Sequence, residues 1–243
     1  MIVEGRNAVS ELIKTQKTID KVLVQNGLRD QPSRELVQEL REAGVKVSYT
    51  DKSVLDKQSK SNGRHQGFMA FVTDFEYSEL YDILQDCEQK DCFLLVLDGI
   101  EDPHNLGSII RVAECAGIDG IIIGKHRSAG VTDTVMRISE GGANHVKIAR
   151  VININSALEQ IKDAGIWVYG LELGGDDIYK TNLKGRLAIV IGGEDTGINR
   201  LTKQKCDGLI SIKMQGKINS LNASVATGVA VFAAVLAVPV TSP

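Results

Sequence analysis

Hydrophobic positions along residues 1–73 alternate between helical and strand spacing. Leu36, Val37 and Leu40 recur at helical spacing and are followed by Gly44, a common helix stop, whereas Phe68–Val72 is a short apolar run typical of a strand. The same pattern predicts helices over 6–13, 33–43 and 52–59, and strands over 21–24, 45–49 and 68–72. Residues 1–73 are therefore predicted to form a small α/β domain.

The pattern changes after an acidic stretch. Residues 74–91 are predicted to be a linker that contains one helix, over 77–87. From residue 92 onward, apolar runs of strand length alternate with helical segments, which is typical of a parallel sheet with helices on both faces. The predicted strands cover 93–97, 120–123, 145–148, 166–169, 187–191 and 209–212, and the predicted helices cover 106–116, 132–139, 156–164 and 199–206. Residues 92–243 are thus expected to form a second, larger α/β domain.

The run from Ala223 to Val238 is almost wholly apolar and resembles a membrane anchor. It is shorter than the roughly 20 residues that span a bilayer, and it lacks flanking Lys, Arg, Trp or Tyr anchors. A helix that is apolar on all sides is usually buried in a core or a subunit interface. We expect one of these two environments and no membrane.

Composition narrows the functional classes. The 243 residues carry a formal net charge of −3, so only a local basic patch could attract a nucleic acid. The four cysteines have no C-x-x-C spacing and no nearby histidine pair, which argues against a zinc or other metal site and against a disulfide framework. Reduced thiols, and an N-terminus without the apolar core of a signal peptide, favour a cytoplasmic protein.

A basic, glycine-punctuated stretch separates the last predicted helix and strand of the first domain. Residues 57–67 contain no acidic side chain, and the candidate RNA-binding residues are Lys57, Lys60, Arg64 and His65. Such a loop can contact RNA phosphates, where Lys and Arg give sequence-independent affinity. A solvated turn explains the same composition equally well.

Three loops of the second domain carry candidate chemistry. The first leads into a helix for which Asn105 is the expected N-cap, and Arg111 lies about two turns further on, on the side of Gly107 and Ser108. Neither G-x-G-x-x-G nor a P-loop occurs there, which removes the main support for dinucleotide or NTP binding. An Arg on an otherwise apolar helix is unusual, and the alternative to a functional role is a structural ion pair.

The second loop follows a buried strand with Gly192 and Gly193 and then two acids, Glu194 and Asp195. Ligands of parallel α/β sheets bind at the carboxyl ends of strands, and glycines leave the backbone open to them. The acids could instead complement the dipole of the helix that follows.

The third loop, residues 212–226, places Asn219, Ser220, Asn222 and Ser224 just before the apolar C-terminal run. Ser220 or Asn219 is expected to cap that helix by accepting hydrogen bonds from free backbone N–H groups. Capping alone would account for these residues. Because two other candidate strand ends lie upstream, the three loops could also converge on one site.

In this order and spacing the three loops resemble the SpoU (TrmH) branch of the SPOUT methyltransferases. The first family motif has an Asn, a Gly two residues later and an Arg four beyond, the second has a Gly-x-Glu core three residues before a Gly, and the third is Ser-Leu-Asn-x-Ser-x-Ala. The matching residues are Asn105, Gly107 and Arg111, then Gly192, Glu194 and Gly197, and finally Ser220, Leu221, Asn222, Ser224 and Ala226. Asp195 and Asn144 depart from the family pattern, which usually has Gly and an acidic residue at these places.

The resemblance extends to the first domain, where Gly5–Val9 and Arg64–Gly67 are similar to the L30e-like substrate-binding domain of bacterial 23S rRNA guanosine-2′-O-methyltransferases. It implies methyl transfer from S-adenosylmethionine to the ribose 2′-hydroxyl of a guanosine in 23S rRNA, with no obligatory metal. It also implies a parallel sheet with a deep trefoil knot, and a homodimer formed through the knotted domain. The rival functions are the same chemistry on tRNA, or a non-catalytic RNA-binding role in ribosome assembly.

The family further implies roles for individual residues. Arg111 would lie at the 2′-hydroxyl and assist its deprotonation, or position it and stabilise its charge, because a guanidinium is a very weak base. The residues implied to fix the RNA phosphate, the loops and the guanidinium are Asn105, Glu194, Ser220 and Asn222. The residues implied to hold the cofactor are Gly192, Gly193, Ile212, Leu221 and Ser224.

Overall fold

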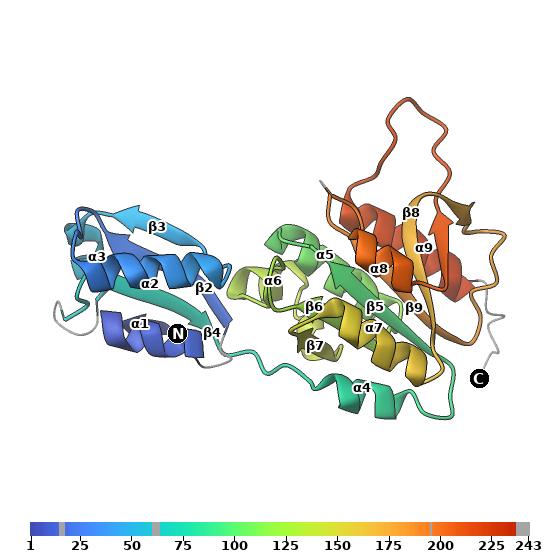
Figure 1. Ribbon diagram of the computed structural model, residues 1–243, viewed down its shortest axis with the longest axis horizontal. Helices are drawn as coiled ribbons and strands as arrows, with labels where there is room; N and C mark the ends of the chain where they lie inside the picture. Colours follow the sequence, from blue (N-terminus) through green and yellow to red (C-terminus); the bar gives the residue numbers. More distant parts are fainter. Residues whose placement is uncertain (15–17, 60–63, 195, 237–243) are drawn as a thin grey trace. The chain divides into compact units, whose positions relative to one another are not determined.

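The computed structural model describes residues 1–14, 18–59, 64–194 and 196–236, which form two compact units (Figure 1). The first unit comprises residues 1–76 together with 130–133, and the second comprises 77–129 together with the chain from 134 onward. Each unit has its own sheet and its own hydrophobic core. Within the described ranges, no helix is long and apolar enough to cross a membrane.

The first unit is built on a four-stranded mixed sheet ordered β1-β4-β2-β3. Its strands are β1 (Ile2–Glu4), β2 (Thr18–Gln25), β3 (Val47–Thr50) and β4 (Phe68–Thr73), and its helices are α1 (Arg6–Lys14), α2 (Gln31–Glu42) and α3 (Lys52–Gln58). Strand β4 is antiparallel to β1 and β2, whereas β2 and β3 are parallel. The helices and strands predicted for this region are confirmed with small shifts at their ends. Strand β1 was not predicted, because three residues are too few to show a period.

The second unit contains a six-stranded sheet ordered β10-β8-β9-β5-β6-β7, in which all neighbouring strands are parallel. The strands are β5 (Cys92–Asp98), β6 (Gly120–Gly124), β7 (Ile148–Val151), β8 (Trp167–Asp177), β9 (Arg186–Gly192) and β10 (Gly208–Ser211). In β5, Leu94 and Val96 join one core cluster, while Leu95 and Leu97 are buried on the opposite face. A strand buried on both faces explains the unbroken apolar run, and the predicted α/β fold with a parallel sheet is confirmed.

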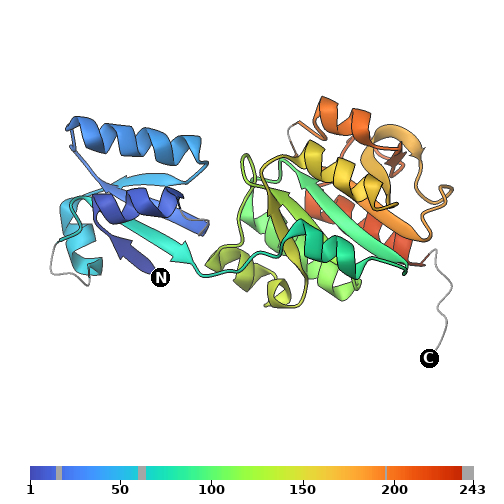
Figure 2. The same cartoon turned by 60° about the horizontal axis from the view of Figure 1, so that its bottom comes forward.

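Helices cover both faces of this sheet, as Figures 1 and 2 show. They are α4 (Leu80–Asp86), α5 (Pro103–Cys115), α6 (Asp133–Ile138), α7 (Ile154–Asp163), α8 (Arg200–Lys205) and α9 (Ala223–Leu236), with a short 3-10 turn, η1 (Gly142–Asn144). On one face Leu158 and Ile161 of α7 pack into the cluster that contains Leu94. Helices α5 and α9 lie together on the other face (Figure 1).

Two strands differ from the prediction. Strand β7 begins at Ile148 and not at 145, because Gly142–Asn144 form η1 and His145 is its C-cap. Strand β8 continues to Asp177, well past the predicted end at 169, because it pairs with β10 at two places separated by a register shift. Between the two pairings with β10, Leu171 still pairs with Ile191 of β9, and the carbonyl of Gly175 accepts from Ser211 Oγ at 2.7 Å.

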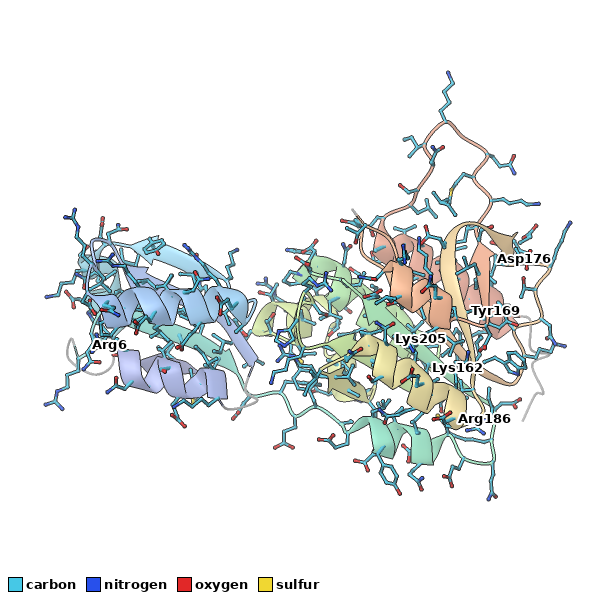
Figure 3. The ribbon with its side chains drawn as sticks, in the orientation of Figure 1. Arg6, Lys162, Tyr169, Asp176, Arg186 and Lys205 are labelled. Carbon is cyan, nitrogen blue, oxygen red and sulfur yellow. The ribbon has the colours of Figure 1, made fainter. Side chains whose placement is uncertain are left out.

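Ion pairs tie α7 to α8 and to the start of β10. Lys162 Nζ lies 2.7 Å from Asp207 Oδ1, and Lys205 pairs with Glu159 of α7 (Figure 3 labels both lysines). Asp207 also accepts a hydrogen bond from the backbone N–H of Val168 at 2.9 Å. These contacts fix β10 at the edge of the sheet, next to β8.

A buried thiol pair lies at the amino end of β5. The Cys87 thiol and the Arg186 guanidinium (Figure 3) lower the pKa of Cys92 to about 7, and the same contact between the thiols raises the pKa of Cys87. Burial raises the pKa of Cys206 to about 11. Among the described residues, no three His, Cys, Asp or Glu side chains gather as metal ligands would. The Cys87–Cys92 pair lies at the amino end of β5, whereas ligands of parallel sheets bind at the carboxyl ends of the strands.

Candidate active site

A cavity of about 390 Å³ opens at the carboxyl end of the parallel sheet, a size within the range of small-molecule sites. Its walls come from β8, from the loop after β9, from the loop between β10 and α9, and from the start of α9. The lining residues are Leu171, Glu172, Leu173, Ile191, Gly192, Gly193, Glu194, Thr196, Gly197, Ile212, Met214, Ser220, Leu221, Ala223 and Ala226. In Figure 1 the loop between β10 and α9 projects from the second unit, and its two ends form part of this wall.

Most residues predicted to hold a cofactor line this cavity. Gly192, Gly193, Ile212 and Leu221 are among its walls. Ser224 lies in the adjoining turn, where its Oγ donates to Asn222 Oδ1 at 2.7 Å. The cavity thus collects four of the five predicted positions around one space, and the fifth supports the turn beside it.

Backbone crowding explains why the loop after β9 begins with two glycines. A Cβ on Gly192 would lie 2.2 Å from the carbonyl carbon of Gly197, and a Cβ on Gly193 would lie 2.4 Å from the carbonyl oxygen of Gly99. Both neighbours are main-chain atoms that cannot rotate away. The glycines are therefore required by the close passage of three backbone segments, and this passage forms one wall of the cavity.

The side chain of Asn222 joins the three predicted loops. Its Nδ2 donates to Asn105 Oδ1 at 2.9 Å and to Glu194 Oε1. Its Oδ1 accepts from the backbone N–H groups of Ser224 at 2.9 Å and Val225 at 3.3 Å. The convergence of the three loops is thus confirmed. The prediction that Ser220 or Asn219 caps the last helix was wrong, because α9 starts at Ala223 and Asn222 supplies the capping oxygen.

The expected cap at Asn105 was also wrong. Helix α5 begins at Pro103, and the carboxylate of Asp102 caps it by accepting from His104 N at 2.9 Å. Proline is favoured at the first position of a helix, which moves the start upstream. Asn105 therefore sits inside the first turn, 7% exposed, with its side chain committed to Asn222.

Arg111 takes no part in the hydrogen bonds that Asn222 makes. Its Nη1 lies 2.7 Å from Glu140 Oε1, and its side chain is 52% exposed. Gly107, one turn earlier, lets α5 pack against Ile138, since a Cβ there would lie 2.7 Å from that side chain. The ion pair considered as the structural alternative for Arg111 is therefore present. An exposed pair of this kind contributes at most about 1 kcal/mol, so a ligand could displace it at small cost.

Glu172 is a cavity residue that the motif search missed. Its Oε2 lies 2.7 Å from Lys203 Nζ and accepts from Ile198 N at 3.4 Å. These contacts attach the loop after β9 to strand β8. Glu172 also lines the cavity beside Gly197. Glu172 follows the predicted strand 166–169 and precedes Gly174 and Gly175, so the strand-end rule used for Glu194 could have found it.

The candidate RNA-binding residues of the first unit separate into two kinds. Lys57 and Arg64 are exposed, whereas His65 is 1% exposed. The His65 Nδ1 accepts from Gly67 N at 2.9 Å, which leaves Nε2 to donate to Asp56 Oδ1 at 2.9 Å. The prediction of RNA contact by His65 was therefore wrong, because both ring nitrogens serve the loop itself. Lys60 lies outside the described residues, as does Asp195 in the second unit.

We predict that Asn222→Ala destabilises the second unit by about 2 kcal/mol, because it removes a helix cap and leaves the buried Asn105 oxygen without its donor. Urea unfolding followed by circular dichroism measures the change. Asn219→Ala, an exposed position of the same loop, is the matched control and is expected to stay within about 0.5 kcal/mol of the parent chain. Equal stability of the two variants would contradict the role of Asn222.

Two family models match the chain. Residues 92–232 match the SpoU rRNA Methylase family, and residues 2–78 match a family described as RNA 2′-O ribose methyltransferase substrate binding. A Staphylococcus aureus (strain COL) protein assigned to the TrmH family of tRNA/rRNA methyltransferases is 41% identical over 235 residues, which cover 95% of this chain and 94% of that protein. YacO of Bacillus subtilis, assigned to the same family, is 40% identical over 95% of this chain and 93% of its own length.

Solved structures show the same fold. The SpoU methyltransferase AviRb of Streptomyces viridochromogenes, in complex with AdoMet, aligns with a TM-score of 0.62 at 23% identity, covering 97% of this chain and 89% of that one. The AdoMet-bound rRNA methyltransferase of Sinorhizobium meliloti aligns with a TM-score of 0.62 at 24% identity, covering 96% and 85%.

A family model thus matches more than half of the sequence, and relatives at 40% identity or above extend over nearly all of it. As its three loop motifs predicted, the chain belongs to the SpoU (TrmH) family of RNA methyltransferases.

Proposed function

We propose that this protein transfers a methyl group from S-adenosylmethionine to the ribose 2′-hydroxyl of a guanosine in 23S rRNA. The observation that carries the proposal is the convergence of Asn105, Glu194 and Asn222 beside a cavity large enough for a nucleoside cofactor. These residues come from the three motifs that resemble the family. Placing the substrate in large-subunit rRNA rests on the resemblance of residues 1–73 to an L30e-like substrate-binding domain.

The cofactor would occupy the cavity at the end of β9. Apolar side chains of Leu171, Ile212, Met214 and Leu221 offer surfaces for an adenine ring, and the backbone from Gly192 onward offers hydrogen-bonding groups that no side chain covers. The AviRb and Sinorhizobium meliloti structures both contain AdoMet, which supports this cofactor for the common fold.

The chemistry requires alignment more than activation of the donor. The ribose oxygen attacks the sulfonium methyl carbon, the carbon–sulfur bond breaks to give S-adenosylhomocysteine, and the hydroxyl proton is released. A hydroxyl is a poor nucleophile at neutral pH, so the protein must hold it in line and stabilise its developing charge. Arg111 fits that role after exchanging its exposed contact with Glu140 for the substrate.

Helix α9 supports the proposed homodimer. It exposes a row of apolar side chains, with Val225 51%, Phe232 40% and Leu236 72% exposed. A second copy of the chain would cover this row, and each site would be completed by the partner. We also propose that the second unit, through which the dimer would form, contains a trefoil knot. Sedimentation equilibrium is expected to give the mass of two chains, and the mass of one chain would count against the dimer.

The first unit would hold the RNA, with Lys57 and Arg64 as exposed phosphate contacts. Lys and Arg at phosphates give affinity that falls with salt. We also propose that the reaction takes place in the cytoplasm, which the four free cysteines support. A double variant, Lys57→Ala with Arg64→Ala, is expected to bind rRNA more weakly and with less salt dependence, as measured by filter binding. Unchanged binding would show that these two residues do not contact the RNA.

We predict that Leu221→Trp weakens S-adenosylmethionine binding at least about tenfold, because the larger ring fills the cavity. Isothermal titration of the intact chain measures the dissociation constant. Ile218→Trp is the control, since Ile218 belongs to the same loop and is 79% exposed. If both variants bound the cofactor as tightly as the parent chain, the cofactor would have to lie elsewhere.

We predict that Arg111→Ala lowers methyl transfer at least about 100-fold while cofactor binding is retained, because the charge that forms on the ribose oxygen loses its stabilising partner. The measurement is incorporation of labelled methyl groups from S-adenosylmethionine into separate rRNA and tRNA pools. Lys184→Ala, an exposed cation before β9, is the control and should keep full activity.

The two RNA pools separate the rival functions. Label in rRNA supports the proposal, and label in tRNA alone would overturn the rRNA substrate. Label in neither pool, with the parent chain, would favour a non-catalytic RNA-binding protein on the same scaffold.

A further inference from the structure

The first unit contains a small cavity between helix α2 and strand β3, outside the motifs that resemble the family. Its lining residues are Val24, Leu28, Ser33, Arg34, Val37, Gln38, Arg41 and Tyr49. Its volume is about 180 Å³, whereas sites for whole drug-sized molecules usually exceed about 300 Å³. The space therefore suits a single planar ring system better than a complete cofactor.

Tyr49 forms one wall of this cavity. It pairs with Val24 in the parallel ladder of β2 and β3, and paired residues of neighbouring strands point to the same face of a sheet. Val24 belongs to the core cluster that includes Val37 of α2, so the Tyr49 ring lies on the side of that helix. Because β3 is an edge strand, the ring stays 53% exposed. An aromatic ring held in this way offers a surface on which another ring can stack.

One stripe of α2 forms the opposite wall. Arg34, Val37, Gln38 and Arg41 recur at the spacing that places side chains on one face of a helix. The Arg34 guanidinium is oriented by the carbonyl oxygen of Arg29, which accepts from its Nε at 2.9 Å and also from its Nη2. Arg41 is exposed, and its side chain forms no ion pair with the residues that the structure describes. Two guanidinium groups thus line the cavity, one held in place and one available for a partner.

The charge of the lining is positive. Among the described residues, none that lines the cavity carries a carboxylate. Two acids of α2 are engaged with amide side chains: Glu35 Oε1 accepts from Gln31 Nε2 at 2.8 Å, and Glu42 Oε1 accepts from Gln38 Nε2 at 2.7 Å. Two cations beside an apolar floor and an aromatic ring favour a ligand with an anionic part and a flat part. A nucleotide of single-stranded RNA combines the two.

The cavity adjoins the basic loop that is proposed to contact RNA. Leu28 lines the cavity and also lies against Gly67, where a Cβ would come within 2.7 Å of Leu28 Cδ1. Arg64, an exposed cation, belongs to the same loop as Gly67. One RNA strand can therefore contact the loop and continue into the cavity.

We propose that this cavity takes one unpaired base of the substrate RNA, stacked on Tyr49, while Arg34 and Arg41 contact the adjoining phosphates. The inference rests on the proposed function for its RNA substrate, and it assigns these three residues to substrate binding. Stacking on an aromatic ring tolerates any base, so the contact recognises a single-stranded segment and not a sequence. Loops and bulges of a folded RNA present such bases, whereas a duplex does not.

The test measures binding of a fluorescein-labelled single-stranded RNA oligonucleotide to the full chain by anisotropy, without cofactor. Tyr49→Leu keeps an apolar side chain but removes the ring, and is expected to weaken binding about tenfold. Tyr49→Phe keeps the ring and is expected to bind like the parent chain. The matched control is Tyr81→Leu, since Tyr81 of α4 is 67% exposed and belongs to the second unit, and its binding should not change.

Arg41→Gln tests the phosphate contact in the same assay over a range of salt concentrations. It is expected to weaken binding several-fold and to reduce the slope of log affinity against log salt by about 0.7, the value for one phosphate of a single strand. Lys184→Gln, an exposed cation of the second unit, is the control and is expected to change neither quantity. With an RNA duplex as the ligand, Tyr49→Leu is expected to bind like the parent chain, because paired bases cannot stack on the ring.

Three results would overturn the proposal. They are parental affinity of Tyr49→Leu for the single strand, equal losses in Tyr49→Leu and Tyr49→Phe, and an equal loss for the duplex. Methyl transfer into rRNA by the parent chain is measured separately. Its absence would refute the proposed function and leave the binding site standing, whereas normal transfer together with an unaffected Tyr49→Leu would refute the binding site alone.

Discussion

One amide side chain, that of Asn222, joins the parts of the second unit that are far apart in sequence. Its oxygen accepts the free N–H groups at the start of α9, and its nitrogen donates to Asn105 on α5 and to Glu194 after β9. An aspartate at position 222 could cap the helix but would repel the carboxylate of Glu194. An alanine there could neither accept nor donate a side-chain hydrogen bond. The side chain must therefore both accept and donate, and few residues of this length can. The candidate site depends on this pair of capabilities more than on any charge.

The second constraint is the closeness of the backbone segments around the cavity. Gly192 and Gly193 pass within van der Waals distance of Gly197 and Gly99, so the wall at this point is main chain. A ligand that reaches it meets peptide groups whose positions are fixed by packing. Glu172 and Lys203 hold the same loop from the side of β8. Preorganised peptide groups suit a cofactor that must be held in line with an attacking hydroxyl.

The sequence predicts the parallel sheet well because strands buried on both faces leave unbroken apolar runs such as those of β5 and β9. It predicts the helix starts less well, because Asn, Asp and Ser are all good caps and several stand near each start. At α5, Pro103 was the available signal that favours Asp102 over Asn105. His65 could not be placed from the sequence, since its burial depends on a tertiary contact with Asp56. The same holds for Arg111, whose partner Glu140 follows another helix.

Asp98, at the end of β5, anchors the loop after β9, which forms one wall of the cofactor cavity. Its carbonyl oxygen accepts from Gly193 N at 3.0 Å, and its carboxylate accepts from Asn199 N at 2.8 Å. Gly197 N closes the loop on the carbonyl of Gly193 at 2.9 Å. A single strand end thus sets the positions of Thr196 and Gly197, and these two residues line the cofactor cavity. A methyl donor in the cofactor cavity would contact this short segment, whose position is set by the sheet.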